Sequence, residues 1–282
     1  MDAIFYFYAN PFQPRSEEAA RRLAEAIQEQ GGRVLTEDWL SSRGVGESCA
    51  FEDIPGCVRA LIAFGGDGTL LRAAPRAAEE KIPVLGVHTG TVGFLMRGNA
   101  DRAAETAALL MKRQYTLEGY SMLDIRYEGE TYLALNDLAL TRGEHPGVIE
   151  TIALADGEEV FCAHGDGAVL STPQGATAYA LSAGGPIVRH DASCLLLTPL
   201  CARELLLRPV VLPMSAKVVL KAHGRDRRRL QLAIDGQTLL PVTHEAQVEI
   251  QVSRQKFYMI SLGEPAFFDT LRKKQAEWNQ QE

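Results

Sequence analysis

The sequence predicts an α/β N-terminal domain with an open, mostly parallel sheet, followed by an all-β, sandwich-like C-terminal domain. Before about residue 113, short apolar runs alternate with segments of helical periodicity, as in parallel sheets covered by helices. From about residue 115, short extended runs follow one another between turn signals, which is typical of antiparallel sheets. The length of 282 residues fits about two domains.

The first domain is expected over residues 1–113, and the glycine-rich loop described below predicts that it binds nucleotide or phosphate. Residues 4–8 are a continuous apolar run, as in a parallel strand buried on both faces. The other expected strands are residues 34–35, 58–64 and 83–87. The expected helices run from Ser16 to about Gly31, from Leu70 with a kink or an end at Pro75, and over 101–113, and residues 39–56 form an irregular, mobile connection.

The second domain is expected over residues 114–262. A turn at 128–130 precedes an extended segment, 131–140, that contains Asn136 and Asp137. Further strands are expected at 149–155, 166–172, 193–198, 209–212, 216–222, 229–235 and 246–262, and a helix start at 174–185. The C-terminal segment, 263–282, is expected to form a helix from Phe267 and to pack back on the first domain.

Composition and charge narrow the functional classes. The chain has 29 Lys and Arg against 36 Asp and Glu, a net charge of −7, so we expect no nucleic-acid or membrane partner. No apolar run is long enough to span a bilayer. The five cysteines show no C-x-x-C spacing, which indicates reduced, mostly buried thiols in a cytoplasmic protein.

The strongest local signal is the run Gly65-Gly66-Asp67-Gly68-Thr69, directly after a predicted buried strand. Glycines there let the backbone turn sharply and approach a ligand, and ligands of open α/β sheets bind at the carboxyl ends of strands. Exposed amides beside a helix N-terminus suit phosphate. A carboxylate among them would orient a hydroxyl, accept its proton or hold Mg²⁺. Phosphate-binding amides next to such a carboxylate indicate phosphoryl transfer. The alternative is that this run is only a turn. The chain has no P-loop and no G-x-G-x-x-G motif, so two common modes of nucleotide binding are absent.

Two further segments carry polar groups suited to a flat ligand. Residues 165–186 are rich in glycine and small side chains, with hydroxyls at Thr177, Tyr179 and Ser182. Taken alone, a helix of small residues more often serves close packing than ligand binding. Asn136 and Asp137 place an amide and a carboxylate within an apolar stretch, either as structural hydrogen-bonding groups or as ribose ligands.

Together these segments resemble the NAD kinase family in order and spacing, over about residues 58–240. Residues 84–95 are similar to the family's second loop, and Thr198-Pro199, Arg208-Pro209 and Asp235-Gly236-Gln237 are similar to its later landmarks. The resemblance implies transfer of a phosphoryl group from ATP, or another donor such as polyphosphate, to the 2′-hydroxyl of the adenosine ribose of NAD, giving NADP. It also implies Mg²⁺ carried by the donor phosphates rather than by protein ligands alone, and a homo-oligomer, a dimer or a tetramer.

The resemblance implies roles for individual residues. Asp67 corresponds to the catalytic proton acceptor, and Gly65, Gly66 and Gly68 to the phosphate side of the site. The implied dinucleotide-binding residues are Asn136 and Asp137 for the riboses and adenine, His164 and Asp166 for the nicotinamide end, Thr177, Ala178, Tyr179, Ala180, Leu181 and Ser182 along the dinucleotide, and Gln237. We expect the dinucleotide to bind in the cleft between the two domains.

The chain departs from the family pattern at Asp137 (usually Glu), Gln174 (Thr), Ala176 (Ser) and Ala202-Arg203-Glu204 (Pro-His-Ser). None of these positions is Asp67. Two other functions remain open: a catalytically silent regulatory protein that binds NAD or NADP, and a lipid or sugar kinase with the same glycine-aspartate-glycine loop. The choice between NAD and NADH and any allosteric control also remain open.

Overall fold

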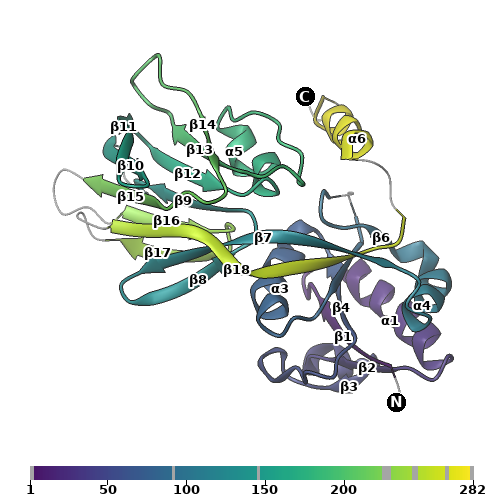
Figure 1. The fold of residues 1–282 in the computed structure, drawn as a ribbon. Coiled ribbons are helices and arrows are strands. Elements are labelled where there is room, and N and C mark those ends of the chain that lie inside the picture. Colours follow the sequence, from purple (N-terminus) through teal and green to yellow (C-terminus); the bar gives the residue numbers. More distant parts are fainter. Residues whose placement is uncertain are drawn as a thin grey trace. The chain divides into compact units, whose positions relative to one another are not determined.

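A computed structural model describes residues 3–90, 93–144, 147–223, 230–242, 247–263 and 267–279 of the chain. The chain forms two compact units, Met1–Gly119 with Phe257–Glu282 and Tyr120–Lys256. The first unit is α/β and the second is all-β, which confirms the predicted fold class (Figure 1). Strands β7 (Thr116–Tyr127) and β18 (Gln247–Ser261) each begin in one unit and end in the other.

The first unit contains a parallel sheet. Its strands run in the order β18–β5–β4–β1–β2–β3, with β6 beside β5, and these neighbours pair in parallel. The strands are β1 (Ile4–Ala9), β2 (Arg33–Thr36), β3 (Glu47–Ser48), β4 (Ala60–Gly65), β5 (Val84–His88) and β6 (Gly98–Asn99). Every residue of β4 is buried, because helices cover both faces of the sheet.

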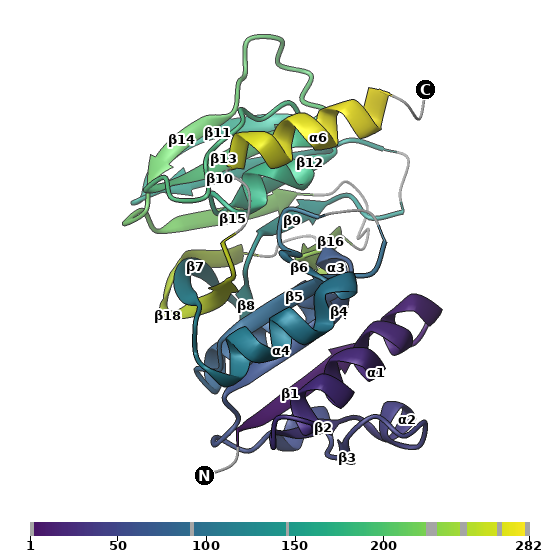
Figure 2. The ribbon, with the colours of Figure 1, turned by 90° about the vertical axis from the view of Figure 1, so that its right-hand side faces the viewer.

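Helices α1 (Pro14–Gln28) and α4 (Ala103–Met111) cover one face of this sheet, and α3 (Asp67–Glu79) covers the other (Figures 1 and 2). Phe5, Phe7, Ile62 and Phe64 form one apolar core with the inner faces of α1 and α4. A 3-10 turn, η2 (Ala100–Arg102), precedes α4, and α6 (Phe267–Asn279) forms where a C-terminal helix was predicted.

Helix α3 differs from its prediction at both ends. It begins at Asp67, three residues before Leu70, and continues past Pro75 to Glu79. Proline removes the hydrogen bond that its own amide would have donated, and its ring crowds the carbonyl four residues earlier, so packing must offset this cost. The alanines that follow it, Ala77 and Ala78, are buried and keep the last turn packed against the sheet. Asp67 therefore belongs to the first turn of a helix rather than to the loop before it.

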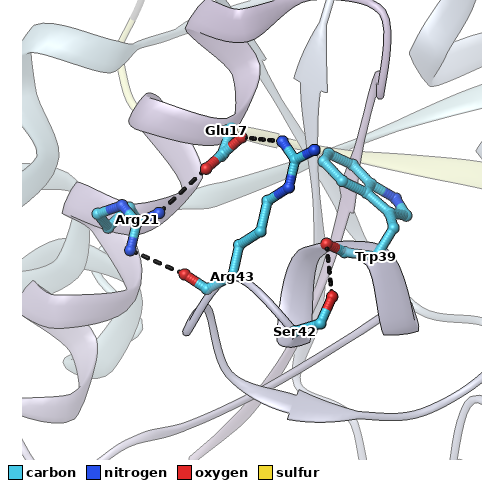
Figure 3. A network of polar contacts seen from close by, with 5 residues as sticks. All are labelled: Glu17, Arg21, Trp39, Ser42 and Arg43. Carbon is cyan, nitrogen blue, oxygen red and sulfur yellow. Dashed lines mark hydrogen bonds and ion pairs between the residues drawn. The ribbon is translucent and has the colours of Figure 1, made fainter.

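The connection between β2 and β4 is irregular, as predicted, with only α2 (Asp38–Ser41), β3 and a 3-10 turn, η1 (Phe51–Asp53). Polar contacts fasten its first part to α1 (Figure 3). Arg43 pairs with Glu17, and Arg21 bonds both Glu17 Oε1 and the Arg43 carbonyl at 3.0 Å. The Arg43 guanidinium also lies 5.5 Å from the centre of the Trp39 ring. Residues 38–43 are thus held against α1 at several points.

The second unit packs two antiparallel sheets against each other. One has the order β14–β13–β12–β9–β16–β17, and the other contains β11–β10–β15–β18, with β8 paired to β7. A single core draws apolar side chains from both sheets. The strands are β8 (Glu130–Ala134), β9 (Asp137–Thr141), β10 (Ile149–Ala155), β11 (Glu158–Gly165), β12 (Gly167–Ser171), β13 (Cys194–Leu200), β14 (Val210–Pro213), β15 (Val218–His223), β16 (Leu230–Ile234) and β17 (Thr238–Val242).

The helix start predicted over 174–185 is short. It consists of a 3-10 turn, η3 (Gly175–Thr177), and one turn of helix, α5 (Tyr179–Ser182). Ala176 and Ala180 pack on Ala139, Val169 and Leu196, on the face of the six-stranded sheet that points away from the main core. The small side chains therefore allow this segment to lie directly on the sheet.

Several expectations need correction or lie outside the described residues. Strands β11 and β17 were not predicted. The cysteines have no disulfide partners, but Cys57, Cys162 and Cys201 are exposed, so the prediction of mostly buried thiols was wrong. Cys162 lies at an outward position of β11, where alternate residues face solvent. The first residues of the strands expected at 229–235 and 246–262, and Thr91-Val92 of the second loop, lie outside the described residues.

Candidate active site

The glycine-aspartate run forms the turn from β4 into α3. β4 ends at Gly65, Gly66 precedes the helix, and Asp67 opens it. A Cβ atom at Gly65 would lie 2.3 Å from Thr69 Oγ1, and the φ angle of Gly65 is +153°, so only glycine fits there. A Cβ at Gly66 would meet no atom within 4 Å, which leaves the backbone at Gly66 open to a ligand.

The Asp67 carboxylate is held by backbone amides of the segment after β5. Phe94 N donates to Oδ2 at 2.9 Å and Leu95 N donates to Oδ1 at 3.1 Å. A Cβ at Gly93 would lie 1.9 Å from Oδ1, so this segment can approach the carboxylate only with glycine at position 93. Because a carboxylate offers about four lone-pair positions, these bonds fix its orientation and leave acceptor capacity.

Burial raises the pKa of Asp67 above its ordinary value. The amides of Phe94 and Leu95 act in the opposite direction because they stabilise the ionised form, and the positive charge of Lys274 does the same. A carboxylate with a raised pKa binds a proton more strongly than a solvated one.

A cavity of about 440 Å³ borders this turn within the first unit. Gly65 and Gly66 line it on one side and Thr89 and Gly90 on another. Phe12, in the connection from β1 to α1, and Arg15, at the start of α1, line it on a third. Strands β1, β4 and β5 are neighbours in the parallel sheet, so these three connections meet at its carboxyl edge. The two loop glycines therefore face a volume that a phosphate group can occupy.

In the second unit, Asn136 and Asp137 lie in a tight turn that the Asp235 carboxylate organises. Asp235 Oδ2 accepts the amide of Leu135 at 2.8 Å, and Oδ1 accepts those of Asn136 and Asp137 at 2.8 and 3.0 Å. These bonds interrupt the extended segment predicted over 131–140, because the three amides cannot also pair with a neighbouring strand. Asn136 is consequently not a strand residue, and β9 begins at Asp137.

The side chains of Asn136 and Asp137 are 7% and 5% exposed. Asn136 Oδ1 is buried and has no hydrogen-bond partner within the described part of the chain. Burial raises the pKa of Asp137 to about 7, and the negative charge of Asp235 adds to the effect. Burial also raises the pKa of Asp235, to about 6, against the three amides that stabilise its ionised form. This turn therefore offers an unsatisfied amide oxygen and an easily protonated carboxyl group.

The segment 177–182 follows this turn closely in space. The Tyr179 amide hydrogen-bonds Asp137, and a Cβ at Gly175 would lie 2.2 Å from the Asn136 carbonyl oxygen. Thr177 Oγ1 bonds the Gln174 carbonyl at 3.3 Å, and Tyr179 and Ser182 are exposed. Ala180 is buried against the sheet, while Ala178 and Leu181 are half-buried. The structure thus brings Asn136, Asp137 and this segment together.

Asp166 and His164 lie at the junction of β11 and β12, and each has a charged partner. Arg142 Nε bonds Asp166 Oδ1 at 2.7 Å. His164 Nδ1 lies 3.1 Å from Glu204 Oε1, and the His164 amide also donates to that carboxylate. Glu204 is one of the positions at which the chain departs from the family pattern, and the structure gives it a contact with a predicted site residue.

Gln237 is exposed and follows Asp235 and Gly236 in the turn between β16 and β17. Its backbone amide donates to the Ile234 carbonyl at 2.9 Å, which closes the turn. The sequence interpretation named Asp235 only as a landmark and did not recognise its contacts, nor those of Gly93, Arg142 and Glu204. The sequence did contain a signal for two of these residues: Gly93 is a glycine that follows a predicted buried strand, and Asp235 is an acidic residue directly before a glycine.

Among the described residues, no cluster of three or more His, Cys, Asp or Glu side chains could hold a metal ion. In that same part of the chain, no helix combines the length and the apolar character needed to cross a membrane.

Comparison with known proteins connects these features. Residues 5–115 match the model of the ATP-NAD kinase N-terminal domain, and residues 135–262 match that of the ATP-NAD kinase C-terminal domain. An NAD kinase of Heliobacterium modesticaldum is 33% identical over 94% of this chain and 95% of its own length. One from Sulfurimonas denitrificans is 32% identical over 94% of this chain and 93% of its own.

Two solved structures share the fold. Yeast NADH kinase, crystallised with NADH, superposes with a TM-score of 0.85 at 21% identity, covering 98% of this chain and 88% of its own. An NAD kinase from Archaeoglobus fulgidus, in complex with ATP, superposes with a TM-score of 0.76 at 22% identity, covering 96% of this chain and 99% of its own. With both family models matched along its length, this chain belongs to the NAD kinase family of enzymes.

Proposed function

We propose that this protein transfers the terminal phosphoryl group of ATP to the 2′-hydroxyl of the adenosine ribose of NAD, giving NADP. The observation that carries the proposal is the position of Asp67: a half-buried carboxylate, oriented by backbone amides, beside glycines that border a cavity. Membership of the NAD kinase family supports the choice of NAD and ATP as substrates.

The first unit supplies the phosphate-binding groups and the proton acceptor. Gly65, Gly66 and Gly68 present backbone to the donor's phosphates, and Asp67 accepts the proton of the attacking hydroxyl. In a loose transition state this proton moves late, after most of the bond to the leaving group has broken, so a carboxylate is a sufficient base. Its raised pKa increases its proton affinity further.

The second unit supplies the groups that hold the dinucleotide. Asn136 and Asp137 bind the riboses and adenine, and the unpartnered Asn136 Oδ1 is the acceptor that a ribose hydroxyl or the adenine amino group would satisfy. The exposed hydroxyls of Tyr179 and Ser182 extend along the dinucleotide. Asp166 and His164 serve the nicotinamide end, and Gln237 contributes from the turn after β16.

We propose that a divalent cation, Mg²⁺, arrives with the donor, held by its phosphate oxygens. When bound, the cation neutralises the charge that develops on the transferred group. The five unpaired cysteines suit a cytoplasmic location, and the family resemblance suggests a homo-oligomer.

The test is incubation of the purified protein with ATP, Mg²⁺ and NAD, with NADP measured by an enzyme that accepts only NADP. We expect NADP to form in proportion to the protein added, with ADP as the other product. Binding of NAD without product would identify a regulatory protein instead. Consumption of ATP only with a lipid or sugar acceptor would identify a kinase of another class.

A further inference from the structure

One wall of the cavity beside Gly65 and Gly66 is formed by the connection from β1 to α1 and the first turn of α1. These supply two side chains of different chemistry, Phe12 from the connection and Arg15 from the helix. The two glycines account for the binding of phosphates, but a cavity of about 440 Å³ holds more than one phosphate group. Neither Phe12 nor Arg15 has a role in the proton transfer. Their contacts indicate what else the cavity binds.

Arg15 is a cation without a counter-ion. It is exposed, and the described residues give it no hydrogen bond and no ion pair, whereas Arg22 on the same helix pairs with Glu18 at 2.8 Å. The described lining of the cavity includes no carboxylate. An unpaired guanidinium in such a cavity is suited to the oxygens of a phosphate chain, which it can bind with two parallel hydrogen bonds.

Phe12 is 86% exposed at the edge of the same cavity. Its backbone is fixed, because its amide donates to Asn10 Oδ1 at 3.0 Å and the Asn10 amide donates to the Phe64 carbonyl at 3.1 Å. An exposed phenylalanine is unremarkable by itself. Phe12, however, is held in place next to an unpaired cation and a glycine turn, and an aromatic face is a surface on which nucleobases stack.

We propose that this cavity recognises the phosphoryl donor as a nucleotide, with the base of ATP stacked on Phe12 and its phosphate chain paired with Arg15. The inference rests on the proposed function, which places the donor's phosphates at Gly65 and Gly66. It deepens that function by separating two classes of donor. A nucleoside triphosphate uses both Phe12 and Arg15, whereas an inorganic phosphate chain has no base and uses Arg15 alone.

The experiment compares Phe12→Ala, Phe12→Tyr and Arg15→Ala with the unaltered protein, at saturating NAD. We measure the KM of ATP and the inhibition constant of tripolyphosphate competing with ATP. Phe12→Ala should raise the KM of ATP about fivefold to a hundredfold, the range of a lost base–aromatic stack, and leave tripolyphosphate inhibition unchanged. Phe12→Tyr should keep the KM of ATP close to that of the unaltered protein. Arg15→Ala should weaken the binding of both ATP and tripolyphosphate.

The matched control is Leu206→Ala, which removes an apolar side chain of similar exposure, 90%, from the other unit and should change neither constant. An unchanged KM of ATP in Phe12→Ala, or an equal loss of ATP and tripolyphosphate, would overturn the stacking. Unchanged tripolyphosphate inhibition in Arg15→Ala would overturn the phosphate contact. If the unaltered protein makes no NADP, the proposed function fails, and direct titration of the same variants with ATP still tests this cavity.

Discussion

Asp235 Oδ1 lies 2.8 Å from the amide nitrogen of Asn136, a residue 99 positions earlier in the chain. The same carboxylate binds the amides of Leu135 and Asp137. In return, the Asp235 amide donates to the Asp137 carbonyl at 2.9 Å. The conformation that presents Asn136 and Asp137 is thus set by a residue that need not touch a ligand itself.

Replacing Asp235 should weaken the binding of NAD more than the binding of ATP. Asp235→Asn keeps one acceptor oxygen but turns an amide group toward one of the three donors, so we expect the KM of NAD to rise roughly tenfold, about the value of one hydrogen bond to a charged group. Asp235→Ala leaves three buried amides without an acceptor and should lower the free energy of unfolding by on the order of 3 kcal/mol or more. Steady-state kinetics and urea denaturation measure the two effects.

The control for these variants is Asp191→Asn, which alters an exposed carboxylate of the same unit that pairs with Arg189. It should leave both KM values and the stability close to those of the unaltered protein. An equal rise in the KM of ATP and NAD in Asp235→Asn would indicate a general structural role and contradict the positioning role.

Gly93 should be irreplaceable for turnover. The Cβ of Gly93→Ala would lie 1.9 Å from Asp67 Oδ1, so the carboxylate or the 93–95 segment must move. A displacement near 1 Å of a catalytic group costs about 100-fold in rate, and we expect kcat to fall by that order with the KM of NAD unchanged. The matched variant is Gly56→Ala, whose Cβ meets no atom within 4 Å. A kcat within twofold of that variant would exclude the contact from catalysis.

Stability should decrease as the pH rises from about 4 to about 7. Asp137 has a pKa of about 7 in the folded protein against an ordinary value of 3.8, so in this range the folded state keeps a proton that the unfolded state has released. Raising the pH lowers the contribution of Asp137 to the free energy of unfolding, by at most about 1.4 kcal/mol per pH unit. Above pH 7 this contribution changes no further. Urea denaturation between pH 5 and pH 8 measures the slope, and Asp137→Asn should reduce it; an unaltered slope would contradict the raised pKa.

The parallel order of the first sheet and the antiparallel character of the second unit follow from local patterns. Residues 4–8 are apolar throughout because β1 is covered on both faces, and alternate residues of β7 and β10 are buried because each has one solvated face. Such patterns depend on neighbours in the sequence, which is why they could be predicted.

The contacts that organise the site could not be predicted in this way. The bonds from Phe94 and Leu95 to Asp67 span 27 and 28 positions, and those from Asp235 to residues 135–137 span 98 to 100. They depend on which loops the sheets bring together. The interruption of the segment 131–140 has the same origin, because a carboxylate distant in the sequence competes for amides that would otherwise pair with a strand.

The most direct test of the central claim is the turnover of Asp67→Asn with ATP, Mg²⁺ and NAD, measured together with NAD binding by titration. Asparagine is similar in size and can keep one acceptor for the amides of Phe94 and Leu95, but it cannot take the hydroxyl's proton. We predict that kcat falls by at least about 100-fold, the lower range for loss of a general base, while NAD binds as before. Turnover within a few-fold of the unaltered protein, with the fold intact, would contradict the role of Asp67 as proton acceptor.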